Sequence, residues 1–151
     1  MAKVFEDYFS ELQADMVSTC IEYVNNRADM IFIYATYEVG DYGFDVFYKI
    51  NNKIVQKNKI NDALEHSEIL YDVSRNRQIA LLDAGNEDLL KLYNICKEYK
   101  REMPTEMKLV YDVANNKLNA TYNYNLIYSN DPEKTSDHVF KEWFEEMGKL
   151  S

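Results

Sequence analysis

The sequence predicts an α+β fold: an antiparallel sheet of about five strands, covered by helices on one face, in the order α-β-β-β-α-α-β-β-α. Two observations predict it. Two pairs of strand-like stretches are each joined by a short turn, and stretches with apolar residues at three- and four-residue spacing stand around them. The chain has 151 residues without a linker or an internal repeat, so we expect one domain over residues 1–151.

The N-terminal stretch from Phe5 to Val24 predicts an amphipathic helix. Its apolar residues recur at three- and four-residue spacing, and acidic residues stand between them. Asn25 and Asn26 are expected to end this helix, because asparagine tolerates the left-handed backbone conformation that follows many helix ends.

The next two stretches predict an antiparallel hairpin. Residues 30–38 are rich in β-branched and aromatic side chains, and residues 42–50 place alternate apolar side chains on one face. Val39-Gly40-Asp41 is the expected turn between them. Asn51-Asn52 then predicts a tight turn into a short third strand at residues 53–55, because asparagine accepts the positive φ that such a turn needs.

The middle of the chain has the least regular pattern. Its apolar residues between positions 61 and 83 follow no single period, and we expect a short helix over residues 61–70. Gly85 predicts a loop, and Asn86 stands where it would cap a further helix with two acids in its first turn. Pro104 is expected to stop that helix, because proline cannot continue the hydrogen-bond pattern.

A second hairpin and a closing helix follow. Residues 107–113 and 118–126 alternate apolar and polar side chains, with Asn115-Asn116 between them. Asp131-Pro132-Glu133 has the order of a helix start, and the apolar residues from Val139 to Met147 recur at helical spacing.

Charge and hydrophobicity exclude two kinds of partner for this chain. The chain has 26 acidic and 17 basic residues and a formal net charge of −9, which opposes binding to phosphate backbones, so we expect no direct nucleic-acid partner. No stretch reaches the roughly 18 apolar residues that a membrane helix needs, and the acidic opening residues do not form a secretory signal. We therefore expect no membrane partner and a cytoplasmic location. Cys20 and Cys96 fall on apolar helical stripes and are expected to be buried thiols.

The sequence predicts no catalytic, metal-binding or cofactor-binding residue and no cofactor. His66 and His138 lack the spacing of a zinc motif, and no glycine-rich phosphate loop occurs. Ser136-Asp137-His138 does not predict a catalytic relay, because adjacent side chains on a helix point to different sides. Carboxylate pairs such as Asp41 with Asp45 favour a solvated acidic face and leave an acid–base or cation site as an alternative.

Tyrosine is unusually frequent in this chain. The chain has 13 tyrosines and one tryptophan. Tyrosine gives a wide contact area with a hydrogen-bonding tip, and it is enriched at protein interfaces. Tyrosines and acids gather at the tip of the first hairpin, which is our predicted partner-binding surface. Its residues are Tyr37, Glu38, Asp41, Tyr42 and Asp45.

Several segments carry a family resemblance over most of the chain, in the same order. They are residues 31–37, 44–49 and 61–62, then 104–112, 116–118 and 122–124, and finally Trp143. This pattern resembles the YezG-like immunity proteins, which are antitoxins of bacterial polymorphic toxins.

The resemblance implies a small cytoplasmic protein that binds and neutralises a secreted toxin, often a nuclease, and that does no catalysis itself. The expected partner is a basic toxin domain, because carboxylates can occupy a phosphate-binding cleft and speed the encounter. Two alternatives remain open. One is a non-catalytic adaptor or self-associating structural protein, and the other is an enzyme that uses carboxylates and a metal.

Overall fold

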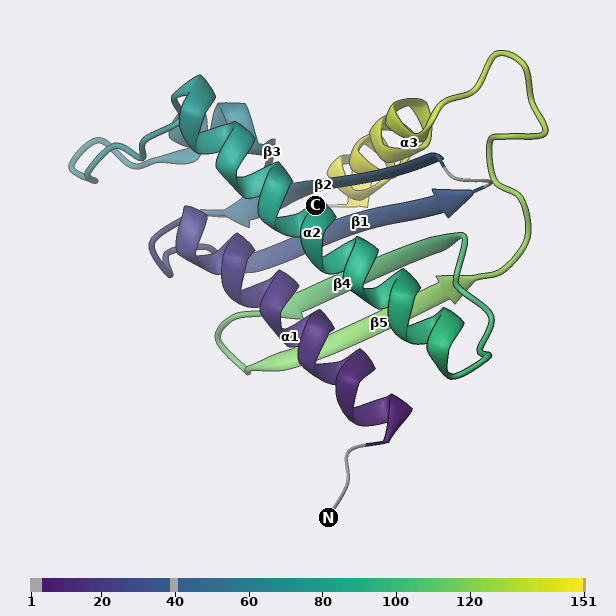
Figure 1. The fold of residues 1–151 in the computed structure, drawn as a ribbon. Helices are drawn as coiled ribbons and strands as arrows, with labels where there is room; N and C mark the ends of the chain where they lie inside the picture. Colours follow the sequence, from purple (N-terminus) through teal and green to yellow (C-terminus); the bar gives the residue numbers. More distant parts are fainter. Residues whose placement is uncertain (1–3, 39–40, 151) are drawn as a thin grey trace.

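The computed structural model describes residues 4–38 and 41–150, and its sheet has five antiparallel strands in the order β3-β2-β1-β4-β5 (Figure 1). The strands are β1 (Met30–Glu38), β2 (Asp41–Ile50), β3 (Lys53–Gln56), β4 (Glu106–Asp112) and β5 (Lys117–Asn123). The described helices are α1 (Phe5–Tyr23), the 3₁₀ helix η1 (Lys57–Ala63), α2 (Arg75–Glu98) and α3 (Ser136–Leu150). The α+β class and the order of elements are those that the sequence predicts.

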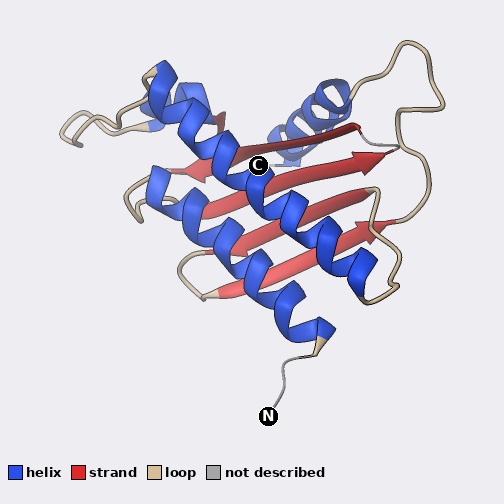
Figure 2. Ribbon diagram, in the orientation of Figure 1, coloured by secondary structure: helices blue, strands red, loops and turns tan. Residues whose placement is uncertain are grey.

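Helices lie on both faces of the sheet, which corrects our expectation of one covered face. Figure 2 shows α1 and α2 side by side across one face, with α3 behind the other. The reason is that β1 is apolar on both sides. Ile31 and Ile33 pack in the core under α1 and α2, whereas Phe32 and Tyr34 pack in a second cluster with Trp143 of α3. A strand that is apolar on both faces needs cover on both.

The second core is a cluster of aromatic rings beneath α3. Phe47 stacks on Phe32 with ring centroids 4.6 Å apart and meets the edge of Trp143 at 5.0 Å. Offset-stacked and edge-to-face pairs are the arrangements that aromatic rings prefer. These contacts hold α3 against β1 and β2, and the side chains of β5 on that face remain exposed, apart from half-buried Asn123.

The predicted asparagine turns are confirmed. Asn25 and Asn26 after α1 have φ of 52° and 61°, and Asn51 and Asn52 between β2 and β3 have φ of 51° and 65°. Asparagine adopts this left-handed region more readily than most residues, and local chemistry therefore fixes both turns. Val39 and Gly40 of the first predicted turn lie outside the described residues.

The predicted break at Gly85 is wrong. The short helix expected over residues 61–70 is misplaced as well: the 3₁₀ helix η1 spans Lys57–Ala63, and residues 64–70 are not helical. α2 runs unbroken through Gly85 and Asn86. Ser74 caps α2, since its hydroxyl accepts a hydrogen bond from the backbone N–H of Arg77 at 3.3 Å. Gly85 is there for packing: a Cβ at this position would lie 2.2 Å from the ring of Phe44.

Two helix boundaries also differ from the prediction. α2 ends at Glu98, before Pro104, and Lys100 takes a positive φ of 55° just beyond it. The closing helix α3 begins at Ser136, after the predicted start at Asp131. Thr135 supplies the cap, because its hydroxyl accepts a hydrogen bond from the backbone N–H of His138 at 3.2 Å.

Cys20 and Cys96 are buried free thiols, as expected. Within residues 4–38 and 41–150 we find no helix with the length and hydrophobicity that crossing a bilayer requires.

Candidate partner-binding site

The structure divides the five residues of the predicted hairpin surface between the two faces of the sheet. Tyr37 is the register partner of Tyr42, and Glu38 is the partner of Asp41. Because side chains alternate along a strand, the two tyrosines lie on the α2 face, whereas the acids Glu38, Asp41 and Asp45 lie on the α3 face. The hairpin therefore presents two different surfaces, one with the tyrosines and one with the acids.

Glu38 points into the protein. Its side chain is 1% exposed, and its carboxylate accepts hydrogen bonds from the backbone N–H groups of Ile127 and Ser129 at 2.8 and 3.1 Å. The Ser129 hydroxyl donates a further bond at 2.6 Å. Glu38 thus holds the segment between β5 and α3, and it is not available to a partner.

The other hairpin residues differ in accessibility. Tyr37 is sandwiched between Tyr42 and Tyr93 of α2, with ring centroids 6.0 and 4.4 Å away, and burial raises the pKa of its phenol. Asp45 forms an ion pair with Lys57 at 3.0 Å, yet burial raises the pKa of its carboxyl above the ordinary value despite this lysine. Asp41 and Tyr42 are the two exposed members.

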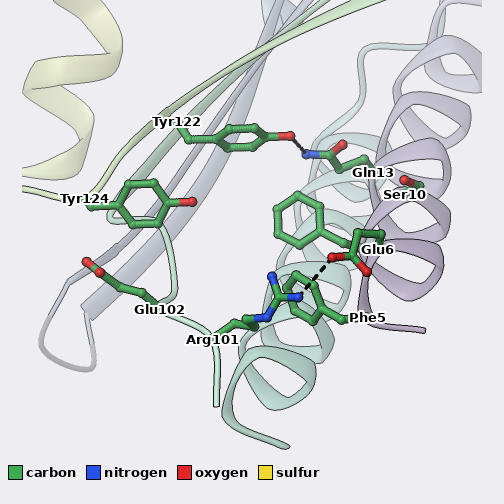
Figure 3. A pocket seen from close by; sticks show the side chains of 9 residues that line it. Phe5, Glu6, Ser10, Gln13, Arg101, Glu102, Tyr122 and Tyr124 are labelled. Atoms are coloured by element: carbon green, nitrogen blue, oxygen red, sulfur yellow. Dashed lines mark hydrogen bonds and ion pairs between the residues drawn. The ribbon is translucent and has the colours of Figure 1, made fainter. Parts of the chain in front are cut away.

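A larger candidate surface lies between α1 and β5. A cavity of about 430 Å³ opens there, with the rings of Phe5, Phe9 and Tyr122 on its walls and Tyr124 at its rim. Figure 3 shows the phenol of Tyr122 directed at the amide of Gln13, to which it is hydrogen-bonded. Phe9 meets Tyr122 edge to face with centroids 5.6 Å apart, so the cavity wall is a packed aromatic surface.

A second cavity lies further along the same helix and strand. It has a volume of about 410 Å³ and is lined by Val17, Ile21, Tyr111 and Leu118, among others. We call the two cavities together the α1–β5 groove. Its helix wall is low, because the outward positions one turn apart on α1 carry small residues. These are Ser10, Ala14 and Ser18, all exposed.

β5 forms an open edge of the sheet beside this groove. It is the last strand in the sheet order, and every residue from Lys117 to Tyr122 is exposed. Leu118 and Tyr122 are 37% and 36% exposed, and the adjoining Tyr124 and Leu126 are about half exposed, at 48% and 49%. Exposed apolar side chains gathered beside an unpaired strand are typical of an interaction surface.

The charges around the groove are mostly acidic. Every charged residue of α1 is an acid, but only Glu6 lines the groove. Glu11, Asp15 and Glu22 are on the α2 side of the helix, where Glu22 pairs with Arg77. One base lines the groove: Arg101 bonds Glu6 at 3.0 Å and lies over the ring of Phe5 at 4.6 Å from its centroid. Partial burial raises the pKa of the Tyr124 phenol, and the neighbouring Tyr122 raises it further.

The α1–β5 groove lies outside the predicted hairpin surface, although the sequence holds a signal for it. No charged residue occurs between Lys117 and Asp131, in a chain with 28% charged residues. The uncharged segment covers β5 from Leu118 onward, together with Tyr124 and Leu126 at the groove and the residues that Glu38 binds. Such a segment on an exposed edge predicts contact with another chain.

In the part of the chain that the structure describes, no three histidine, cysteine, aspartate or glutamate side chains group as metal ligands would. No family model matches the chain, and the search of curated proteins also found no match. The resemblance to the YezG-like immunity proteins therefore stays a prediction.

Proposed function

We propose that this protein is an immunity protein that binds a basic toxin domain, a nuclease, and neutralises it by occluding its active surface. The observation that carries the proposal is the α1–β5 groove: an aromatic cavity beside an open strand edge, with the carboxylates of Glu6 and Glu102 in its lining. A nuclease must hold a phosphate backbone, so its cleft is basic, and an acidic protein with exposed aromatic side chains is a complementary ligand.

The arrangement of the chain is consistent with a binding role. The segments that carry the family resemblance fall on β1, β2, η1, β4, β5 and the aromatic cluster at Trp143, and Tyr122 and Tyr124 among them line the groove. Tyr122 is fixed from two sides, by the Phe9 ring and by the Gln13 amide. A surface that is already ordered before binding loses less conformational entropy when it binds.

To occlude the toxin, this protein needs only to bind it tightly and to cover its active surface. The net charge of −9 attracts a basic domain over a distance of about one Debye length, roughly 8 Å at physiological ionic strength. The short-range contacts of the groove then hold the complex. We expect salt to slow association strongly and to change dissociation much less, since dissociation depends on the buried contacts.

The test first asks whether a neighbouring gene encodes a secreted protein with a nuclease-like C-terminal domain. That toxin domain is then co-expressed with this protein, with cell survival and copurification as readouts. Tyr124→Ala should reduce both, whereas the matched control Leu70→Ala should not. Leu70 is a 70% exposed apolar residue in the loop before α2 and lines neither cavity. If the wild-type protein neither protects the cells nor copurifies, the proposal is wrong.

A further inference from the structure

We infer that the partner binds by strand addition: an extended segment with basic flanks pairs with the open edge of β5 and places apolar side chains in the two cavities of the α1–β5 groove. This inference rests on the proposed function and specifies how the partner is held. The sheet would gain a sixth strand, and main-chain hydrogen bonds would supply much of the affinity.

The hydrogen-bond alternation of the sheet shows which groups of β5 face outward. Between β1 and β4, Tyr37 donates to the carbonyl of Thr105 and Val113 donates to the carbonyl of Asp29. Odd-numbered residues of β4 are therefore directed to β1 and even-numbered ones to β5. The partners of those even residues are Lys117, Asn119, Thr121 and Asn123. It follows that the backbone N–H and C=O groups of Leu118, Ala120 and Tyr122 are directed to the open edge.

The two edges of the sheet differ in how well they resist pairing. β3 has four residues, begins with a lysine and runs straight into η1. β5 has seven residues and no charge after Lys117, although charges, prolines and shortness are the usual means of protecting an edge strand. The β5 edge is therefore the one that is ready to accept another strand.

The groove specifies the side chains of the added strand. Leu118 lines one cavity and Tyr122 the other, and four residues of a strand span about 13 Å. Side chains of the added strand at positions i and i+4 lie on the same face and have this separation. We therefore expect large apolar residues at these two positions. The side chains on the other face would lie beside Asn119 and Thr121, which favours polar residues there.

Charge selects a basic partner over a second copy of this chain. Two carboxylates line the first cavity: Glu102, and Glu6 of α1, which pairs with Arg101. Pairing two copies through β5 would bring together two molecules of net charge −9. A segment flanked by lysine or arginine would instead meet these carboxylates with opposite charge.

The first experiment measures amide hydrogen exchange of the whole protein with a synthetic peptide as the probe. The peptide is extended, has phenylalanine at two positions four residues apart, threonine between them and lysine at both ends. We expect exchange at Leu118, Ala120 and Tyr122 to slow at least tenfold, with no change in β3. A control peptide with aspartate at both ends should give at least tenfold weaker protection. If the lysine-flanked peptide binds without protecting these three amides, strand addition is overturned.

The second experiment uses the toxin domain and the variant Ala120→Pro. Proline at this position removes an outward N–H and leaves the ladder to β4 intact, whereas Thr121→Pro would break that ladder. Affinity should fall at least tenfold in Ala120→Pro and stay within twofold in the control Ala120→Thr. Circular dichroism establishes that both variants fold, and the peptide experiment stands without any variant.

The outcomes separate this inference from the proposed function. If Ala120→Pro neutralises the toxin as well as the wild type does, strand addition is wrong and the immunity function stands. If the wild type gives no protection at all, the immunity function falls, and strand addition is then judged by the peptide experiment alone. If sedimentation shows a dimer that Ala120→Pro dissociates, the occupant of the edge is a second copy, and the inference of a basic partner is overturned.

Discussion

The buried carboxylate of Glu38 binds Ser129 through both its backbone N–H and its hydroxyl, at 3.1 and 2.6 Å. These two residues come from β1 and from the loop after β5, and their contact ties the uncharged segment of the chain to the central strand. The segment that ends at this anchor includes β5, so we expect the anchor to contribute to the order of the α1–β5 groove.

Glu38→Gln should destabilise the protein. The glutamine amide would bring an N–H₂ group toward backbone donors that now bind a carboxylate oxygen, leaving some of them without an acceptor. We expect the free energy of unfolding to fall by about 2 kcal/mol in urea denaturation. Asp41→Asn is the control, because this exposed acid on the same hairpin should change stability by less than about 0.5 kcal/mol. An equal effect of both changes would contradict the anchoring role of Glu38.

Gly85→Ala should destabilise the protein although alanine favours helices. The added methyl would lie 2.2 Å from the Phe44 ring, which is buried between α2 and the sheet and must shift. Overpacking of this kind costs about 1–3 kcal/mol, against roughly 1 kcal/mol gained in helix propensity, so we expect a net loss of up to about 2 kcal/mol.

Gly148→Ala in α3 is the matched control for this change. A Cβ at position 148 meets nothing within 4 Å, so only the propensity gain remains, and thermal unfolding should shift upward slightly. A rise in stability for Gly85→Ala as well would show that Phe44 does not pack against α2 as described.

Asp88→Asn should change how stability depends on pH. Burial, together with the neighbouring Asp15 carboxyl, raises the pKa of Asp88 from 3.8 to about 7. Between these two pH values the folded protein holds a proton that the unfolded chain has released, so this group lowers stability as pH rises through the window. Asparagine does not ionise, so the Asp88→Asn variant does not lose this stability as pH rises. We expect the variant to be more stable than the wild type by roughly 1–3 kcal/mol at pH 8 and nearly equal to it at pH 4.

Urea denaturation of both proteins from pH 4 to pH 8 checks this. The difference between variant and wild type isolates the interacting pair Asp88 and Asp15 from the other titrating groups. A difference that stays constant over the range would contradict the raised pKa.

Local chemistry made most of the fold predictable. The asparagine pairs predict their turns, and the strict alternation of apolar and polar side chains predicts the second hairpin. Both the turns and the hairpin depend on residues that are neighbours in the sequence. The predicted break at Gly85 is wrong for the opposite reason. Its role is set by Phe44, a residue on another element, and no local pattern distinguishes a glycine that makes room for a ring from one that breaks a helix.

The candidate site shows the same limit. Glu38 looks like an exposed acid at a hairpin tip, but its partners Ile127 and Ser129 come from a distant part of the sequence, and only the fold brings them together. α3 lies on the unexpected face because Phe32 and Phe47 need cover there, and the alternation of β1 could have shown this. The uncharged stretch after Lys117 can be recognised in the sequence alone, but only the strand order places it at the edge of the sheet.

Blocking the groove tests the central claim most directly. Ser10 and Ser18 are exposed on its helix wall, and tryptophan at either position would fill a cavity without disturbing the core. Ser67→Trp in the loop before α2 is the matched control. Calorimetric titration with the toxin domain should show at least tenfold weaker binding for Ser10→Trp and Ser18→Trp and unchanged binding for Ser67→Trp. Equal affinity in all three variants would contradict binding through the α1–β5 groove.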